Sequence, residues 1–234
     1  MTNKYMHIII LLSLLFCVYA WAQQGIYLEQ RVHRSGVMGQ PAKDMIQKSW
    51  LTDNAVRVES ADNTVIFRFD QDKVWTLQPA QKTYIELTMD QMRAMAHMGM
   101  SMMKESKQNK FDVKITGKKK TINGWKCYEV ISKSPTMKQS IWLTKDLPYG
   151  KEIYYNFFKR MPKVKEMAEL IYNNKEIEGF PVLNEMEMNV MGIEIKSSSE
   201  LKKVREEKIS PKLFELPKNY TKTSNPMMQM PRPR

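Results

Sequence analysis

The chain has 234 residues, 42% of them hydrophobic, and a formal net charge of +12 at pH 7. This length allows one domain with a sizeable core, and the positive charge favours anionic partners such as phospholipid headgroups or nucleic acid. After the N-terminal apolar run, no stretch approaches the roughly 18 to 20 apolar residues that cross a bilayer, which excludes a helical membrane protein.

The first 22 residues have the pattern of a signal peptide. Lys4 supplies a positive charge, residues 8–18 are apolar except for Ser13, and Ala20-Trp21-Ala22 is a small-x-small cleavage pattern. We therefore expect cleavage before Gln23, export to the periplasm or beyond, and no nucleic acid as a partner. Loss of Lys4 lowers the formal charge from +12 to +11. Cys127 becomes the single cysteine, so no intramolecular disulfide forms, and we expect a buried, inert thiol.

Alternation of apolar and polar residues predicts several short strands. They are punctuated by turn residues, of which Asn123-Gly124 is the strongest hairpin signal. Strands joined by such turns form a meandering antiparallel sheet with one dry face, which two helical regions can cover. The apolar positions that alternate most clearly are Val56, Val58, Val65, Phe67, Phe69, Phe111, Val113 and Ile115.

The first helical region follows Thr88 and is rich in methionine. Thr88 and Gln91 have the spacing of a capping box, and Lys104 and Lys107 lie near the expected end. At 100° per residue, the methionines occupy one arc, while His97 lies in the middle of the polar arc. The methionines of this arc are Met89, Met92, Met95, Met98, Met100, Met102 and Met103.

Two interpretations of this methionine face remain open. Met95, Met98 and Met102 could bind Cu(I) or Ag(I), because soft thioethers select such ions. An adaptable apolar face is favoured instead, since methionine at helical spacing is usually a packing residue and the helix contains neither Leu nor Ile. Such a face would line a cavity or pack on the sheet.

The second helical region spans about residues 149–172. An apolar stripe passes through Tyr154, Phe157 and Phe158, and Pro162 restarts the helix. The simplest interpretation is a helix that covers the sheet. The functional interpretation is one wall of a cavity between helix and sheet.

Catalytic motifs are absent from the sequence. The mature chain has only His33 and His97, and it lacks zinc-protease, nucleophile-elbow, dithiol and phosphate-loop motifs. Glu185 and Glu187 share one side of an expected strand, where a solvated face is the ordinary interpretation. We therefore expect no enzyme and no cofactor.

Four segments carry a resemblance to a known family. They are "TGKKKTINGWKCYEV" (116–130), "IWLTKDLP" (141–148), "GFPVLNEMEM" (179–188) and "LFELPKNY" (213–220). Their order and spacing resemble the exported bacterial family called domain of unknown function 4412. That family in turn resembles the LolA-like and LolB-like lipoprotein carriers. The resemblance implies an incomplete antiparallel β-barrel wrapped over helices around an apolar cavity.

Together these observations predict an α+β protein with a strongly curved sheet of about 9–11 strands over two or three helices. We expect a signal peptide at 1–22, one LolA-like domain at 23–222 and a disordered tail at 223–234. The predicted function is non-catalytic binding of a lipid-like or amphiphilic ligand by a monomer, with an anionic membrane surface as a second partner. Alternatives are a Cu(I) or Ag(I) protein and a structural envelope module with a closed core. The predicted cavity residues are Met92, Met95, Met98, Met102, Tyr154, Phe157 and Phe158.

Overall fold

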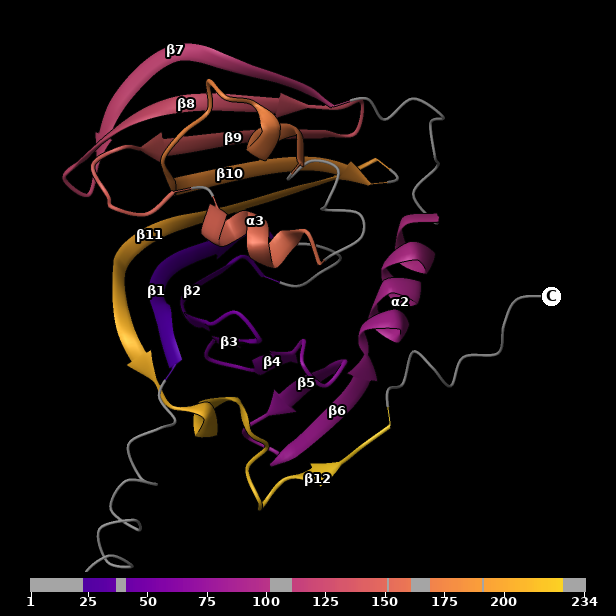
Figure 1. The fold of residues 1–234 in the computed structure, drawn as a ribbon. Coiled ribbons are helices and arrows are strands. Elements are labelled where there is room, and N and C mark those ends of the chain that lie inside the picture. The colour runs from indigo at the N-terminus through magenta and orange to yellow at the C-terminus, as the bar shows by residue number, and fades with distance from the viewer. Residues whose placement is uncertain are drawn as a thin grey trace, which may run out of the picture.

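The computed structural model describes residues 23–36, 41–101, 111–150, 152–160, 169–190 and 192–224. Within these ranges the strands form a single twelve-stranded sheet that curls around helix α3 (Figure 1). The strands are β1 (Gln23–Arg34), β2 (Lys43–Leu51), β3 (Ala55–Glu59), β4 (Thr64–Arg68), β5 (Lys73–Gln78), β6 (Thr83–Thr88), β7 (Asp112–Ile122), β8 (Trp125–Lys133), β9 (Met137–Thr144), β10 (Phe180–Val190), β11 (Ile193–Ile209) and β12 (Thr221–Lys222).

The sheet consists of two meanders joined at its centre. The strand order is β12-β6-β5-β4-β3-β2-β1-β11-β10-β9-β8-β7, and every pair is antiparallel except β12 with β6. The strand β1 therefore lies between β2, its neighbour in the chain, and β11, which pairs Gln23 with Ile209. The predicted hairpin turn is present, because Asn123 and Gly124 join β7 to β8 with φ of 50° and 88°.

Three irregularities in strand pairing accompany the curvature. The register shifts at Glu29/Gln30 in β1, at Pro181/Leu183 in β10 and at Ile115/Lys119 in β7. An extra residue of this kind bends a strand and increases its twist. The expected α+β class with one open, curved antiparallel sheet is confirmed. The described residues contain twelve strands where about nine to eleven were expected; one of the twelve, β12, has only two residues, too few to show alternation.

Strands β3, β4 and β5 carry buried residues on both faces, whereas the sequence predicted one dry face. Val56, Phe67 and Val74 form one apolar cluster. Ile66 and Trp75, their neighbours in the chain, point the other way and belong to a second cluster. This second face is dry because the segment of residues 210–222, here named the C-terminal strap, packs across it through Phe214 in the short helix η1 (Pro211–Phe214).

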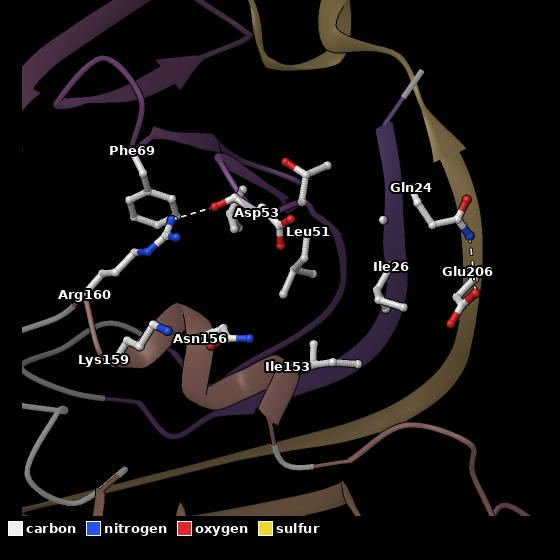
Figure 2. Close-up of a pocket in the computed structure, with 13 residues that line it drawn as sticks. Gln24, Ile26, Leu51, Asp53, Phe69, Ile153, Asn156, Lys159, Arg160 and Glu206 are labelled. Atoms are coloured by element: carbon white, nitrogen blue, oxygen red, sulfur yellow. Dashed lines mark hydrogen bonds between the residues drawn. The ribbon is translucent and has the colours of Figure 1, made fainter. Parts of the chain in front are cut away.

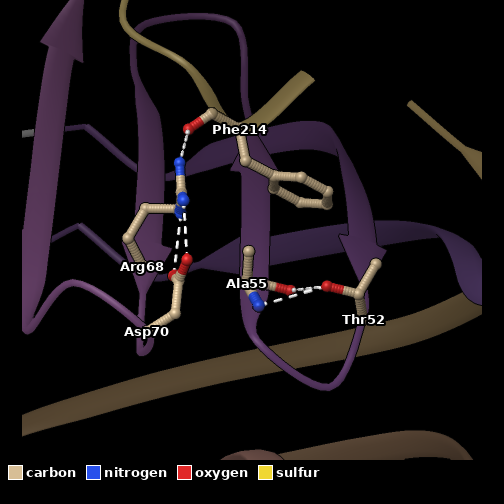
Figure 3. Close-up of polar contacts among 5 residues, drawn as sticks. All are labelled: Thr52, Ala55, Arg68, Asp70 and Phe214. Atoms are coloured by element: carbon tan, nitrogen blue, oxygen red, sulfur yellow. Dashed lines mark hydrogen bonds and ion pairs between the residues drawn. The ribbon is translucent and has the colours of Figure 1, made fainter. Parts of the chain in front are cut away.

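Polar contacts fix the strap to the sheet. Arg57 donates a hydrogen bond to the carbonyl of Leu213, and Arg68 donates one to the carbonyl of Phe214 at 3.5 Å. Figure 3 shows Arg68 between that carbonyl and the carboxylate of Asp70, to which it donates a hydrogen bond at 2.7 Å. The polar residues that alternate with Val56 and Phe67 thus bind the strap and do not simply face water.

The methionine helix is α2 (Met89–Ser101), and its predicted capping box is confirmed. The backbone N–H of Gln91 donates to Oγ1 of Thr88 at 3.1 Å, and the backbone N–H of Thr88 donates to Oε1 of Gln91 at 2.9 Å. Met89 is buried, and Met92 packs against the cluster around Phe67. The expected end near Lys107 lies outside the described residues.

The second helical region contains α3 (Glu152–Phe158) and a helical turn at residues 169–173. Residues 161–168, with the expected restart at Pro162, lie outside the description. Ile153 of α3 packs on the central cluster of the sheet, beside Leu28 and Phe180. No helix in the described ranges is both long enough and apolar enough to cross a membrane.

Candidate functional site

A cleft of about 410 Å³ lies between α3 and the inner surface of the curved sheet (Figure 2). Its volume falls within the range of about 300 to 1,000 Å³ that is common for small-molecule sites. The lining residues come from β1, the end of β2, the β2–β3 turn, β3, the residue after β4, α3 with the two residues that follow it, and β11. They are Gln24, Gly25, Ile26, Leu51, Thr52, Asp53, Val56, Phe69, Ile153, Asn156, Lys159, Arg160 and Glu206.

Strand pairing builds the apolar floor of the cleft. Ile26 lies opposite Leu51, and Leu51 lies opposite Val56, so the three side chains form a row across β1, β2 and β3. Gly25 lets the chain approach closely here, because a Cβ at this position would lie 2.5 Å from the Leu51 carbonyl oxygen. Ile153 faces this floor from α3 (Figure 2).

The β2–β3 turn is held by a local side chain. Oγ1 of Thr52 accepts a hydrogen bond from the backbone N–H of Ala55 at 3.1 Å and donates one to its carbonyl at 3.0 Å (Figure 3). The turn places Asp53 at the mouth of the cleft. The backbone carbonyl of Asp53 can therefore act as an acceptor for a residue of α3.

Two cations lie at the C-terminal end of α3. Arg160 donates a hydrogen bond to the Asp53 carbonyl at 2.8 Å, and its guanidinium lies 4.3 Å from the ring centre of Phe69 (Figure 2). Lys159 donates to Oδ1 of Asn156 at 2.8 Å. Neither cation forms an ion pair with a carboxylate in the described part of the chain. Neutral groups thus orient both positive charges, and neither charge is neutralised there by an acid.

The opposite end of the cleft is acidic. Glu206 of β11 accepts a hydrogen bond from the side chain of Gln24 at 3.2 Å, and Figure 2 shows this pair across the cleft from Arg160. The cleft therefore combines an apolar floor with a basic end and an acidic end. This arrangement suits a ligand with an apolar body and a polar head.

The predicted cavity residues are distributed differently. Met92 and Met95 are half-buried residues of α2, and neither lines this cleft. Met92 adjoins it indirectly, because it packs against the cluster that contains Val56, and Val56 lines the cleft. The side chains of Met98, Tyr154, Phe157 and Phe158, and all of Met102, lie outside the described residues. A role for the predicted set as cavity lining remains a prediction.

Sequence reasoning did not select Lys159, Arg160 or the β2–β3 turn. Two cations at the end of a helix are ordinary complements of its dipole. Nothing in the sequence near Asp53 indicates that its carbonyl meets Arg160, because that contact joins segments more than a hundred residues apart. The weak signal in the sequence was the apolar stripe of the second helical region, because Ile153 in that region lies about two turns before the cations.

Titratable groups elsewhere do not assemble a reactive centre in the described part of the chain. No group of three or more His, Cys, Asp or Glu side chains that could hold a metal occurs there. Cys127 is buried, and burial raises the pKa of its thiol, which disfavours the nucleophilic thiolate.

The geometry defines an open, curved antiparallel sheet with a ligand-sized cleft under a short helix. The chain belongs to the family described as domain of unknown function (DUF4412), whose model matches residues 28–220. This match confirms the predicted family membership. A search of curated proteins found no match.

Solved structures give only loose likenesses. A crystal structure of PNGF-II is 12% identical with a TM-score of 0.38; the match covers 86% of this chain, but this chain spans only 31% of PNGF-II. A LolA superfamily protein from Nitrosomonas europaea is 7% identical with a TM-score of 0.32, covering 82% of this chain and 90% of that one. A domain described as an outer membrane lipoprotein-sorting protein, from Vibrio parahaemolyticus, is 10% identical with a TM-score of 0.32, covering 82% and 89%.

Proposed function

We propose that this protein is a non-catalytic binding protein for a lipid-like or amphiphilic ligand, exported to the periplasm. The ligand's apolar part lies on the floor made by Ile26, Leu51 and Val56. Its anionic head faces Lys159 and Arg160. The signal-peptide pattern of residues 1–22 supports the location.

The single observation that carries this proposal is the composition of the cleft. An apolar row of side chains ends at two cations that have no carboxylate partner in the described part of the chain. Each buried methylene of a ligand contributes about 0.8 kcal/mol, so a short acyl segment supplies most of the affinity. The two cations then determine which head group is preferred, and they favour an anionic one.

Ligand binding is tested first on protein purified from the periplasm. Native mass spectrometry with lipid extraction should reveal a co-purified amphiphile, and a fluorescent fatty acid should bind and be displaced by unlabelled fatty acid. A protein that is always empty and also fails to bind the fluorescent fatty acid contradicts the proposal.

The role of the two cations is tested by substitution. Lys159→Gln combined with Arg160→Gln should weaken binding of a fatty acid by roughly 2- to 30-fold and leave a fatty alcohol of the same length unaffected. Lys175→Gln combined with Lys218→Gln removes the same charge from exposed positions away from the cleft and serves as the control. If the variant binds the fatty acid and the fatty alcohol equally more weakly, the anionic head group does not lie at Lys159 and Arg160.

The location is tested separately. N-terminal sequencing of the exported protein should begin at Gln23. Retention of residues 1–22 in the mature protein, or recovery only from the cytosol, contradicts the proposed export.

A further inference from the structure

Three methionines outside the helical region lie together on one face of the sheet. Met137 of β9 is directly opposite Met188 of β10, and Gln139 is directly opposite Met186. Side chains two residues apart on a strand share a face, so all four emerge on the same side. We name these four residues the Met–Gln rectangle. The strands β9 and β10 that carry it are adjacent in Figure 1.

Backbone geometry brings the four side chains within reach of one small ion. Directly opposite residues have Cβ atoms about 4.5 to 5.5 Å apart, and a two-residue step along a strand is about 6.6 Å. A methionine side chain has three rotatable bonds and can move its sulfur from a corner of the rectangle towards the centre. All three methionines are half-buried, so their sulfurs are neither locked in the core nor fully solvated.

The fourth corner of the rectangle is Gln139, whose side-chain amide oxygen accepts no hydrogen bond from a described residue. Gln139 is only 6% exposed, and its Oε1 has no hydrogen-bond partner among the described residues. Its Nε2 donates to Oδ1 of Asn184 at 2.8 Å, so the amide oxygen is directed away from Asn184. A buried polar atom without a partner is unusual in a folded protein and requires a water, an ion or a ligand.

The described residues directly opposite the rectangle on the neighbouring strands are uncharged. Across the neighbouring strands, Gln139 lies opposite Ser132, Met186 opposite Ser197 and Met188 opposite Ile195. The charged pair Lys138 and Glu187 belongs to the other face of the same two strands. In the described part of the chain, no positive side chain lies directly opposite the rectangle; Arg34 of β1 is on this face but is exposed and two strands away from Met186.

From these observations we propose that the Met–Gln rectangle is a binding site for a soft monovalent metal ion, Cu(I) or Ag(I). Thioether sulfur is a soft ligand that selects such ions over Zn(II), Mg(II) or Ca(II). The three sulfurs supply the main bonds, and Oε1 of Gln139 supplies a weaker fourth contact. This site is separate from the cleft beside α3 and does not depend on ligand binding there.

The test is anaerobic titration of the purified protein with Cu(I) in competition with a chromogenic Cu(I) chelator. One equivalent should bind. Replacing Met137, Met186 and Met188 together by leucine should weaken binding by more than about 100-fold, and Gln139→Leu alone by about tenfold. Leucine conserves the volume of methionine, and the circular dichroism spectrum of the triple variant should match that of the parent.

A matched triple variant distinguishes this site from the methionine face of α2. Met95→Leu, Met98→Leu and Met102→Leu remove the same number of sulfurs and should leave the Cu(I) affinity unchanged. An affinity that falls only in the helix variant, or equally in both, overturns the proposal. So does a protein that binds no Cu(I).

A direct readout keeps the proposal testable if the sheet variant folds poorly. In the parent protein labelled with ¹³C-methyl methionine, addition of Ag(I) should shift the methyl resonances of Met137, Met186 and Met188 together. Shifts confined to other methionines overturn the site. Fatty-acid binding should persist in the sheet variant.

Discussion

At the scale of single residues, Glu129 is a buried carboxylate that is surrounded by hydrogen-bond donors and a cation. Its side chain accepts hydrogen bonds from Thr116 and Ser140, each at 2.8 Å, and Lys118 lies 3.6 Å away. Burial alone would raise the pKa of the Glu129 carboxyl. The hydrogen bonds and the nearby cation outweigh burial and lower the pKa below its ordinary value. Because Thr116 and Lys118 flank Gly117 in the β7 bulge, the carboxylate also fixes the bend of that strand.

We predict that Glu129→Ala lowers the free energy of unfolding by about 2–3 kcal/mol at pH 7, since hydrogen bonds to a charged group are lost. A carboxyl whose folded pKa is lowered stabilises the fold above its unfolded pKa, and this stabilisation is lost as the pH falls through the folded pKa. The difference between parent and variant should therefore shrink in acid. Urea titrations at about pH 7 and about pH 3 measure it. Glu185→Ala, an exposed carboxyl on the next strand but one, should change stability by less than about 0.5 kcal/mol.

Cys127 provides a second prediction at this scale. It is 3% exposed and lies among Leu28, Trp142 and Phe180, and burial raises the pKa of its thiol. An aromatic disulfide reagent should not label the native protein at neutral pH, and one thiol should react in denaturant. Rapid labelling of the folded protein, with exported material as the sample, would show instead that the thiol is accessible.

At the scale of elements, two glycines have positive φ for different reasons. One only needs the left-handed backbone conformation, and the other also lies very close to a neighbouring strand. Gly179 precedes β10 with φ of 94°, and a Cβ there would lie 2.2 Å from the carbonyl oxygen of Thr144 in β9. Gly124 in the β7–β8 turn has φ of 88° and open space around it. Both positions disfavour a side chain, but only Gly179 also brings two strands together.

Gly179→Ala should therefore cost more stability than Gly124→Ala. We expect about 1–2 kcal/mol for the turn, from backbone strain alone, and about 3 kcal/mol or more for Gly179, where the β9–β10 contact must also move. Chemical denaturation of both variants measures the difference. Equal losses of stability in the two variants would show that β10 can move away from β9 at no cost in free energy.

Elements with a local signal could be predicted from the sequence. The capping box of Thr88 and Gln91 and the turn at Asn123-Gly124 both depend on residues within three positions of each other, and both are present. The second dry face around Ile66 could not be predicted, because Phe214 covers it from the far end of the chain. Alternation reveals which residues share a face, but it does not reveal what lies on that face.

The cleft shows the same limit. Its floor follows from strand pairing that alternation indicated, with Val56 among the expected apolar positions. Its polar ends depend on contacts of Arg160 with Asp53 and of Glu206 with Gln24, which join distant segments. Counting methionines and aromatics directed attention to α2 and to the apolar stripe of α3, while the cations stood immediately after that stripe.

At the scale of the whole molecule, the C-terminal strap completes the core of the β2–β6 half. Phe214 is 3% exposed, and Leu213, Leu216 and Tyr220 pack on the same cluster. The strap ends in β12, whose Thr221 pairs with Thr83 of β6. Without the strap, Ile66, Trp75 and Leu77 would lose part of their cover.

Truncation after Ser210 should therefore lower the unfolding midpoint strongly and promote aggregation, because burial of Phe214 alone contributes about 1.5–3 kcal/mol. Truncation after Ser224 keeps the strap and should leave the midpoint unchanged. Thermal unfolding followed by circular dichroism, with light scattering for aggregation, compares the two. An unaltered midpoint in the shorter protein would show that the strap covers the sheet without contributing to its stability.

The pairing of β1 with β11 has a consequence for the order of folding. The other antiparallel contacts of the sheet join strands that follow one another in the chain. All of them close over short loops at little entropic cost except β9–β10, which residues 145–179 connect. The β1–β11 contact brings Gln23 beside Ile209, and it cannot form until the C-terminal part of the chain is present. Each meander can begin to form by itself, and we expect the joining of the two halves into one sheet to be a late, slow step. If the chain is exported as proposed, this pairing postpones closure of the sheet until nearly all of the chain has crossed the membrane.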